Sequence, residues 1–185
     1  MAVGTAGYFF YGQQKKSLKQ EKWEQLNAIA DLKVRQIANW RKERMEDTSI
    51  ILESPFIFYH VQQFMKNPEA FQVRQEMIEW IESLQRRYHY QTIFLLDARG
   101  AVQLSVIEGK EILGSYAKTL ALEAMRKKEV IFSDIHRGEA VGEIHINLLV
   151  PLFNPKDKET LSAGAILLRI HPNQFLYPLI QSRRP

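Results

Sequence analysis

Polar side chains on three expected strands are the residues best suited to binding chemistry. The strands are expected over residues 130–136, 143–153 and 161–170. Because successive strand residues point to opposite faces of a sheet, alternation gathers on one face Asp134, His136, His145, Asn147 and Arg169. A buried arginine suits a carboxylate through paired hydrogen bonds, and a buried aspartate suits an amine. The pattern indicates a small-molecule site; the alternative is that these residues face solvent or pair with one another.

Two aromatic residues complete the expected binding set. The same alternation places Phe132 with Asp134 and His136, and Tyr116 opens an expected helix over 116–128. The predicted ligand-binding residues are therefore Tyr116, Phe132, Asp134, His136, His145, Asn147 and Arg169.

Catalytic, metal and cofactor sites find little support in the sequence. The chain has no cysteine, which excludes disulfides, zinc–thiolate sites and thiol nucleophiles. There is no glycine-rich phosphate loop, nucleophile elbow or HExxH sequence. Asp134, His136 and His145 lack the spacing of a recognised metal motif. We expect no catalytic residue, no metal and no cofactor, and so a segment that is not an enzyme.

The elements that position these residues follow from hydrophobic patterning. β-rich runs cover 92–97 and 101–107, joined by the turn Asp97–Gly100, and precede the three strands above. Helices are expected from Pro68 to about Tyr88, with Asn67 as N-cap, over 116–128 with Ser115 as cap, and over 173–181. This order predicts an α+β fold in which a long N-terminal helix packs on a five-stranded, mainly antiparallel sheet. Pro151 is expected to end its strand.

One long amphipathic helix is expected before this domain. Residues 15–52 contain neither glycine nor proline, and apolar residues recur at three- and four-residue steps. A helix this long, roughly three times the usual ~11–12 residues, either pairs with another chain, projects from a membrane, or packs along a core. The residues of its apolar stripe are Trp23, Leu26, Ala30, Val34, Ile37, Met45, Thr48 and Leu52.

The first fourteen residues have two interpretations. Residues 1–12 carry no charge but are shorter than the about 20 residues that span a bilayer. They are either the end of a transmembrane helix or a tail; Lys15 and Lys16 alone would favour a cytoplasmic following loop. The formal net charge of +4 is mild and interspersed, so it does not indicate nucleic-acid binding.

Four segments resemble the extracytoplasmic Cache (PAS-like) sensor domains of bacterial signalling proteins. They are residues 28–47 (AIADLKVRQIANWRKERMED), 94–100 (FLLDARG), 133–135 with 145–151, and 164–177 (GAILLRIHPNQFLY). Two positions depart from the pattern, since relatives commonly have Asp in place of His171 and Trp in place of Arg184.

The resemblance implies a receptor function. Such domains, in sensor histidine kinases, chemoreceptors and diguanylate cyclases, bind a small ligand outside the cell. It implies a membrane remnant at 1–14, a signalling helix at 15–53 and a sensor domain at 54–185. It further implies a ligand bearing a carboxylate or amine, a homodimer through the N-terminal helix, and an inner-membrane protein whose sensor domain faces the periplasm or exterior. The alternatives are a cytoplasmic PAS- or GAF-like module that dimerises through the long helix, and a small enzyme with an unrecognised site.

Overall fold

The computed structural model describes residues 2–106, 113–139, 142–157, 159 and 161–181. The helices are α1 Ala2–Asp47, α2 Ser49–Leu52, α3 Pro55–Lys66, α4 Phe71–Tyr88, α5 Ser115–Lys127 and α6 Leu176–Gln181. The strands are β1 Thr92–Asp97, β2 Val102–Ser105, β3 Ile131–Phe132, β4 His136–Arg137, β5 Ile144–Leu152 and β6 Gly164–Ile170. The predicted α+β class is confirmed. The predicted strand end at Ile107 and the position of Arg184 lie outside the described residues.

All the strand pairs are antiparallel, and the sheet order is β2-β1-β6-β5-β3, with β4 also paired to β5. Within the described ranges the sheet has six strands rather than the expected five. The expected strand at 130–136 is broken into β3 and β4, because the buried hydroxyl of Ser133 bonds to main-chain groups of Asn147 and Asp134. This break changes which side chains share a face.

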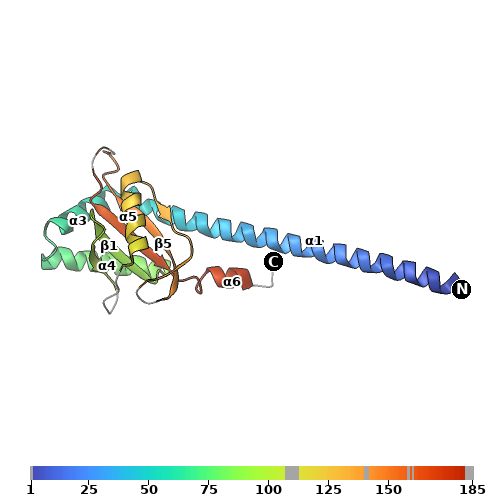
Figure 1. The fold of residues 1–185 in the computed structure, drawn as a ribbon. Helices are drawn as coiled ribbons and strands as arrows, with labels where there is room; N and C mark the ends of the chain where they lie inside the picture. The colour runs from blue at the N-terminus through green and yellow to red at the C-terminus, as the bar shows by residue number, and fades with distance from the viewer. Residues whose placement is uncertain (1, 107–112, 140–141, 158, 160, 182–185) are drawn as a thin grey trace.

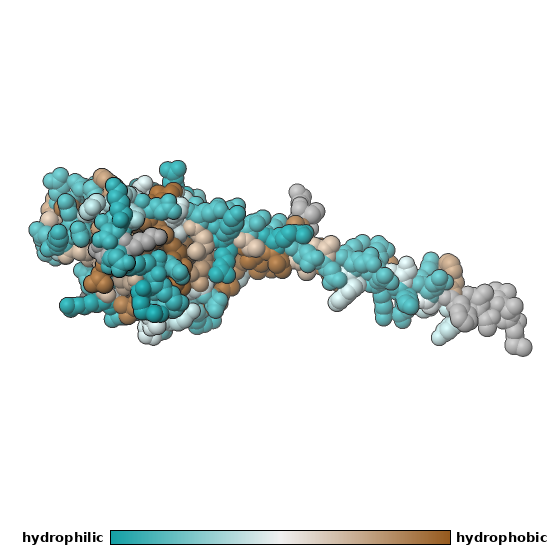
Figure 2. Space-filling view, turned by 90° about the horizontal axis from the view of Figure 1, so that it is seen from above, coloured by the Kyte–Doolittle hydropathy of each residue, from teal (hydrophilic) through white to brown (hydrophobic). Residues whose placement is uncertain are grey.

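Helix α1 projects from the domain as a stalk, and α6 lies alongside its domain-proximal half (Figure 1). Helix α1 includes the uncharged residues 2–14 and runs for 46 residues without interruption. Trp23 and Val34 are 65% and 66% exposed, so the expected apolar stripe is unpacked over the stalk. Packing against the core begins at Ile37 and Trp40. The stalk's visible face is mostly hydrophilic (Figure 2).

Local hydrogen bonds set where α1 ends and where the next helices begin. The Thr48 hydroxyl donates to the carbonyl of Met45 at 2.6 Å. This bond competes with the main-chain hydrogen bonds of the helix, and α1 and α2 are separated at this residue. Ser54 then caps α3, accepting from the amide of Ile57, with Pro55 in the first turn. No helix in the described part of the chain combines the length and apolar character needed to cross a membrane.

The sheet separates two hydrophobic cores. On one face, helices α1 to α4 cover residues such as Ile93, Leu148 and Leu168. On the other, α5 packs three buried alanines, Ala117, Ala121 and Ala124, on the sheet. Small alanine side chains let α5 approach the sheet closely.

Four boundary predictions are corrected. Helix α4 starts at Phe71 with Ala70 as N-cap, because residues 67–70 form a turn closed by the Ala70 amide on the Asn67 carbonyl. Gly114 rather than Ser115 is the N-cap of α5. The C-terminal helix starts at Leu176 after a turn, not at Asn173.

The fourth correction concerns Pro151, which lies inside β5 paired with Ala165 instead of ending the strand. Proline is tolerated there because β3 pairs with β5 only at Leu148 and Leu149, so the strand edge at Pro151 needs no N–H donor in the part of the sheet that is described.

Candidate ligand-binding site

The candidate site lies at one end of the sheet face that α5 covers. Cross-strand register places Arg169 of β6 between Thr92 of β1 and Asn147 of β5. The adjacent row on the same face is apolar, with Phe94, Leu167 and Leu149 beneath α5. The face therefore changes from apolar under α5 to polar beyond it.

The polar end is buried. Asn147 is fully buried, and Thr92, His145 and Arg169 are 1%, 4% and 4% exposed. The alternative in which these side chains face solvent is therefore wrong for His145, Asn147 and Arg169. Burying polar groups costs free energy unless they are hydrogen-bonded, so the partners of these groups define the site.

A chain of hydrogen bonds runs from Arg169 to His136. The Nε of Arg169 donates to Oδ1 of Asn147 at 3.3 Å, and Nδ2 of Asn147 lies 3.2 Å from Nε2 of His136. An amide nitrogen only donates, so Nε2 of His136 accepts. The other ring nitrogen, Nδ1, then carries the proton and donates to the carbonyl oxygen of Asp134 at 2.9 Å. The neutral form of His136 thus satisfies both of its contacts in this series of hydrogen bonds.

Three aromatic rings extend the site toward the surface. The His136 ring meets His145 at a centroid distance of 4.4 Å and Tyr116 at 4.7 Å, both edge-to-face. Tyr116 comes from the first turn of α5 and is 40% exposed, which makes it the outer wall. The carboxylate of Glu139 caps that turn, accepting from the amides of Ser115 and Tyr116. The hydrogen bond from the Ser115 hydroxyl, followed by those from the two amides, lowers the pKa of Glu139.

The positive charge of the site lies on the guanidinium of Arg169. The Cζ of Arg169 lies 5.1 Å from the ring centroid of Phe94, a cation–π arrangement. Burial, followed by the positive charge of Arg169, lowers the pKa of His145 to about 4. His145 is therefore neutral at pH 7, and the permanent charge of the cluster lies on Arg169.

Five of the seven predicted residues are brought together: Tyr116, His136, His145, Asn147 and Arg169. Phe132 is on the opposite face, where its ring packs on Trp40 at 5.7 Å, so the predicted alternation is wrong there. Asp134 is exposed, and its main-chain carbonyl rather than its carboxylate joins the chain of bonds. The break at residues 133–135 shifts the alternation by one, which moves His136 but not Phe132 to this face.

Three further residues of the site were not predicted. Ser133 accepts from the amide of Asn147 at 2.8 Å and fixes the strand break. Thr92 and Phe94 flank Arg169 across β1. The sequence predicts that Thr92 and Phe94 lie in a strand over residues 92–97. It does not predict the sheet order that places β1 beside β6. Among the described residues, no three His, Asp or Glu side chains form a group able to hold a metal ion.

Comparisons with known proteins agree with this architecture. No family model and no curated protein sequence matches the chain. The structure of the Vibrio cholerae histidine kinase DctB sensor domain matches with a TM-score of 0.65 at 10% identity, over 89% of this chain and 61% of that one. The chain therefore shares the fold of that domain. The predicted resemblance is thereby confirmed at the level of fold.

Chemoreceptor domains with bound amino acids match the same fold. The Campylobacter jejuni Tlp3 sensory domain with isoleucine bound matches with a TM-score of 0.63 at 12% identity, over 91% of this chain and 66% of that one. The Pseudomonas fluorescens CtaA ligand-binding domain with L-isoleucine gives 0.57 at 14% identity, over 92% and 65%. The chain thus spans a little under two thirds of the length of these sensor domains.

Proposed function

We propose that this chain is an extracytoplasmic sensing domain of a bacterial membrane receptor, and that it binds a small ligand at the polar end of the α5 face. The observation that carries this proposal is the buried Arg169–Asn147–His136 chain. A guanidinium held by an amide and an aromatic ring is costly to bury and is positioned for an anion. The sensor-domain fold supports the same function.

The ligand we propose is a small L-amino acid or a related carboxylate. Tlp3 structures hold L-norvaline, L-valine and isoleucine, and CtaA structures hold L-alanine and L-isoleucine. In this chain Arg169 would bind the carboxylate, and the exposed carboxylate of Asp134 would bind an ammonium group. Phe94 and Tyr116 would contact an aliphatic side chain.

Signal transfer would run from Arg169 to the stalk through β6. The strand ends at Ile170, and the chain then reaches α6, which packs on α1. Nζ of Lys33 in α1 donates to the carbonyl of Leu179 in α6 at 2.7 Å. A ligand that binds one arrangement of β6 better than another would shift the population of the α6–α1 contact.

The same proposal assigns the remaining parts of the chain. Residues 1–14 would be the end of a membrane helix in the inner membrane, 15–53 the signalling helix, and 54–185 the sensor domain. Two copies would pair through exposed apolar residues of α1, namely Trp23, Leu26, Ile29 and Val34. Apolar residues at these spacings suit helix pairing.

Thermal unfolding with a panel of aliphatic L-amino acids and small carboxylates tests the ligand site. We expect at least one compound to raise Tm, as a ligand that binds only the folded state must. Tyr116→Ala should weaken that compound at least about tenfold, since an aromatic wall is lost. Tyr59→Ala, at a half-exposed tyrosine on α3, is the matched control and should leave affinity unchanged. A panel without any stabilising compound would contradict the proposal.

A further inference from the structure

A hollow lies between helices α3 and α4, on the sheet face opposite α5. Its volume is about 250 Å³, and it is lined by Phe56, Ile57, His60, Glu76, Met77 and Trp80. None of these residues belongs to the candidate site above. The two helices lie at the end of the domain away from the N-terminus (Figure 1).

Aromatic side chains form much of the wall of this hollow. Phe56 is 69% exposed, and its ring stacks on His60 with the centroids 4.0 Å apart. Trp80 is half-buried on the α4 side. Because Phe56 is this exposed to solvent at the edge of an apolar hollow, its ring offers aromatic surface that a ligand could cover.

The polar groups of the hollow are hydrogen-bond acceptors. Nδ1 of His60 lies 3.2 Å from the carbonyl oxygen of Phe56, which can only accept, so Nδ1 carries the proton and Nε2 of the neutral ring is an acceptor. The carboxylate of Glu76 already accepts from Gln72 and keeps further acceptor positions. Of the described lining residues, none is lysine or arginine.

We propose that this hollow binds a small organic cation, specifically a primary ammonium carried on one aromatic ring. The carboxylate of Glu76 and Nε2 of His60 complement the three N–H donors of an ammonium. The faces of Trp80 and Phe56 attract a cation and also cover an apolar ring. The volume lies below the ~300–1,000 Å³ typical of small-molecule sites, which limits the ligand to one ring with a short amine chain.

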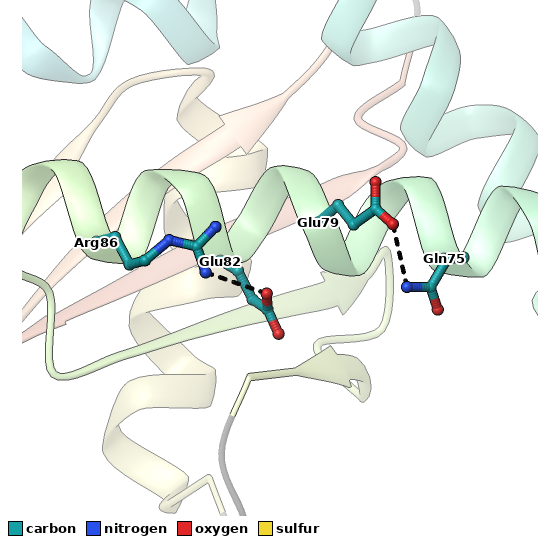
Figure 3. A network of polar contacts seen from close by, with 4 residues as sticks. All are labelled: Gln75, Glu79, Glu82 and Arg86. Atoms are coloured by element: carbon teal, nitrogen blue, oxygen red, sulfur yellow. Dashed lines mark hydrogen bonds and ion pairs between the residues drawn. The ribbon is translucent and has the colours of Figure 1, made fainter.

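Helix α4 itself supplies a matched control for the carboxylate. The amide of Gln72 donates to Glu76 at 3.2 Å, and the amide of Gln75 donates to Glu79 at 3.1 Å in the same i to i+4 arrangement. Figure 3 shows the second pair, with the Glu82–Arg86 ion pair further along the helix. Glu79 does not line the hollow. Glu79→Gln therefore removes the same charge from the same helix without altering the proposed site.

The test is calorimetric titration of the whole chain with 2-phenylethylammonium, 2-phenylethanol and 3-phenylpropionate. We expect the ammonium to bind more tightly than the alcohol, and the carboxylate least. Glu76→Gln should weaken the ammonium about fivefold, as loss of a partly exposed ion pair does, and leave the alcohol unchanged. Glu79→Gln should change neither. Thermal unfolding of both variants checks that the fold is retained.

Two outcomes would overturn the proposal. One is equal binding of the three probes, or binding that Glu76→Gln and Glu79→Gln weaken alike, since either result removes the role of the Glu76 carboxylate. The other is a concentration-dependent dimer that Phe56→Ser dissociates in sedimentation analysis, since the hollow would then be covered by a second copy of the chain. Neither outcome affects Arg169, so this inference fails or holds independently of the proposed amino-acid site.

Discussion

Asn147 accepts a hydrogen bond from Nε of Arg169 at 3.3 Å, and neither side chain is more than 4% exposed. The same amide is 3.2 Å from His136, so one side chain holds both a guanidinium and an imidazole in place. Its orientation is fixed, because reversing the amide would set a donor against the arginine N–H. The neighbouring side chains thus orient the buried Arg169 guanidinium in the absence of a ligand.

Replacing Asn147 by leucine should lower the free energy of unfolding by about 2–3 kcal/mol. Leucine removes an acceptor from a buried charged group, and such a loss costs part of the desolvation of that group. Urea unfolding at pH 7 measures it. Asn39→Leu, at an exposed site on α1, is the control and should have little effect. A loss below about 0.5 kcal/mol at Asn147 would mean that the hydrogen bond does not hold Arg169.

Stability should fall as the pH decreases from about 6.5 to about 4. The pKa of His145 is lowered from 6.5 to about 4 in the folded chain by burial and by the charge of Arg169. Between these values the unfolded chain binds a proton that the folded chain does not, so unfolding is favoured as pH falls. Acidification across this range should lower the free energy of unfolding by about 2–3 kcal/mol through this residue.

The comparison of wild type with His145→Gln isolates this effect from other titrating groups. Urea unfolding between pH 7 and pH 4 should show a shallower pH dependence for the variant, because glutamine has no proton to gain. Equal slopes for the two proteins would show that His145 already titrates normally in the folded chain.

The fold class was predictable from the sequence, but the exact membership of the site was not. Alternation within 143–153 and 161–170 correctly paired His145 with Asn147 and placed Arg169 with them, because β5 and β6 are long and regular. It failed at Phe132, because a strand of two residues has no alternation to extend across a break.

The missed residues depended on tertiary structure. Thr92 joins the site only because β1 pairs with β6, a contact between residues far apart in the sequence. The exposure of Trp23 to solvent could not be predicted either, because periodicity identifies an apolar stripe without showing whether the domain packs against it. The site that forms at the end of the sheet follows from register, and single-sequence patterns do not give register between distant strands.

Gly164→Ala should destabilise the fold by about 3 kcal/mol or more. A Cβ at this position would clash with the carbonyl oxygen of Leu96, and backbone cannot move aside as a flexible side chain does. Thermal unfolding measures the loss. Gly12→Ala is the control, since nothing lies within 4 Å of its Cβ and alanine favours the helix. Equal Tm values for Gly164→Ala and wild type would contradict the close pairing of β1 with β6.

Glu139→Ala should loosen the first turn of α5 without unfolding the domain. The carboxylate accepts from the amides of Ser115 and Tyr116 and from the Ser115 hydroxyl, groups that helix starts leave without intrahelical partners. Hydrogen exchange should become faster at the amides of residues 115–117 and remain slow in β5. Unchanged exchange at Tyr116 would mean that the cap does not hold the outer wall of the site.

The most direct test of the proposed function is a crystal structure of the chain with the compound that raises Tm most in the amino-acid and carboxylate panel. We expect its carboxylate within hydrogen-bond distance of the Arg169 guanidinium, at about 2.7–3.2 Å, with Tyr116 against its side chain. Density for the compound away from Arg169, whether between α3 and α4 or on the stalk, would contradict the proposed ligand site.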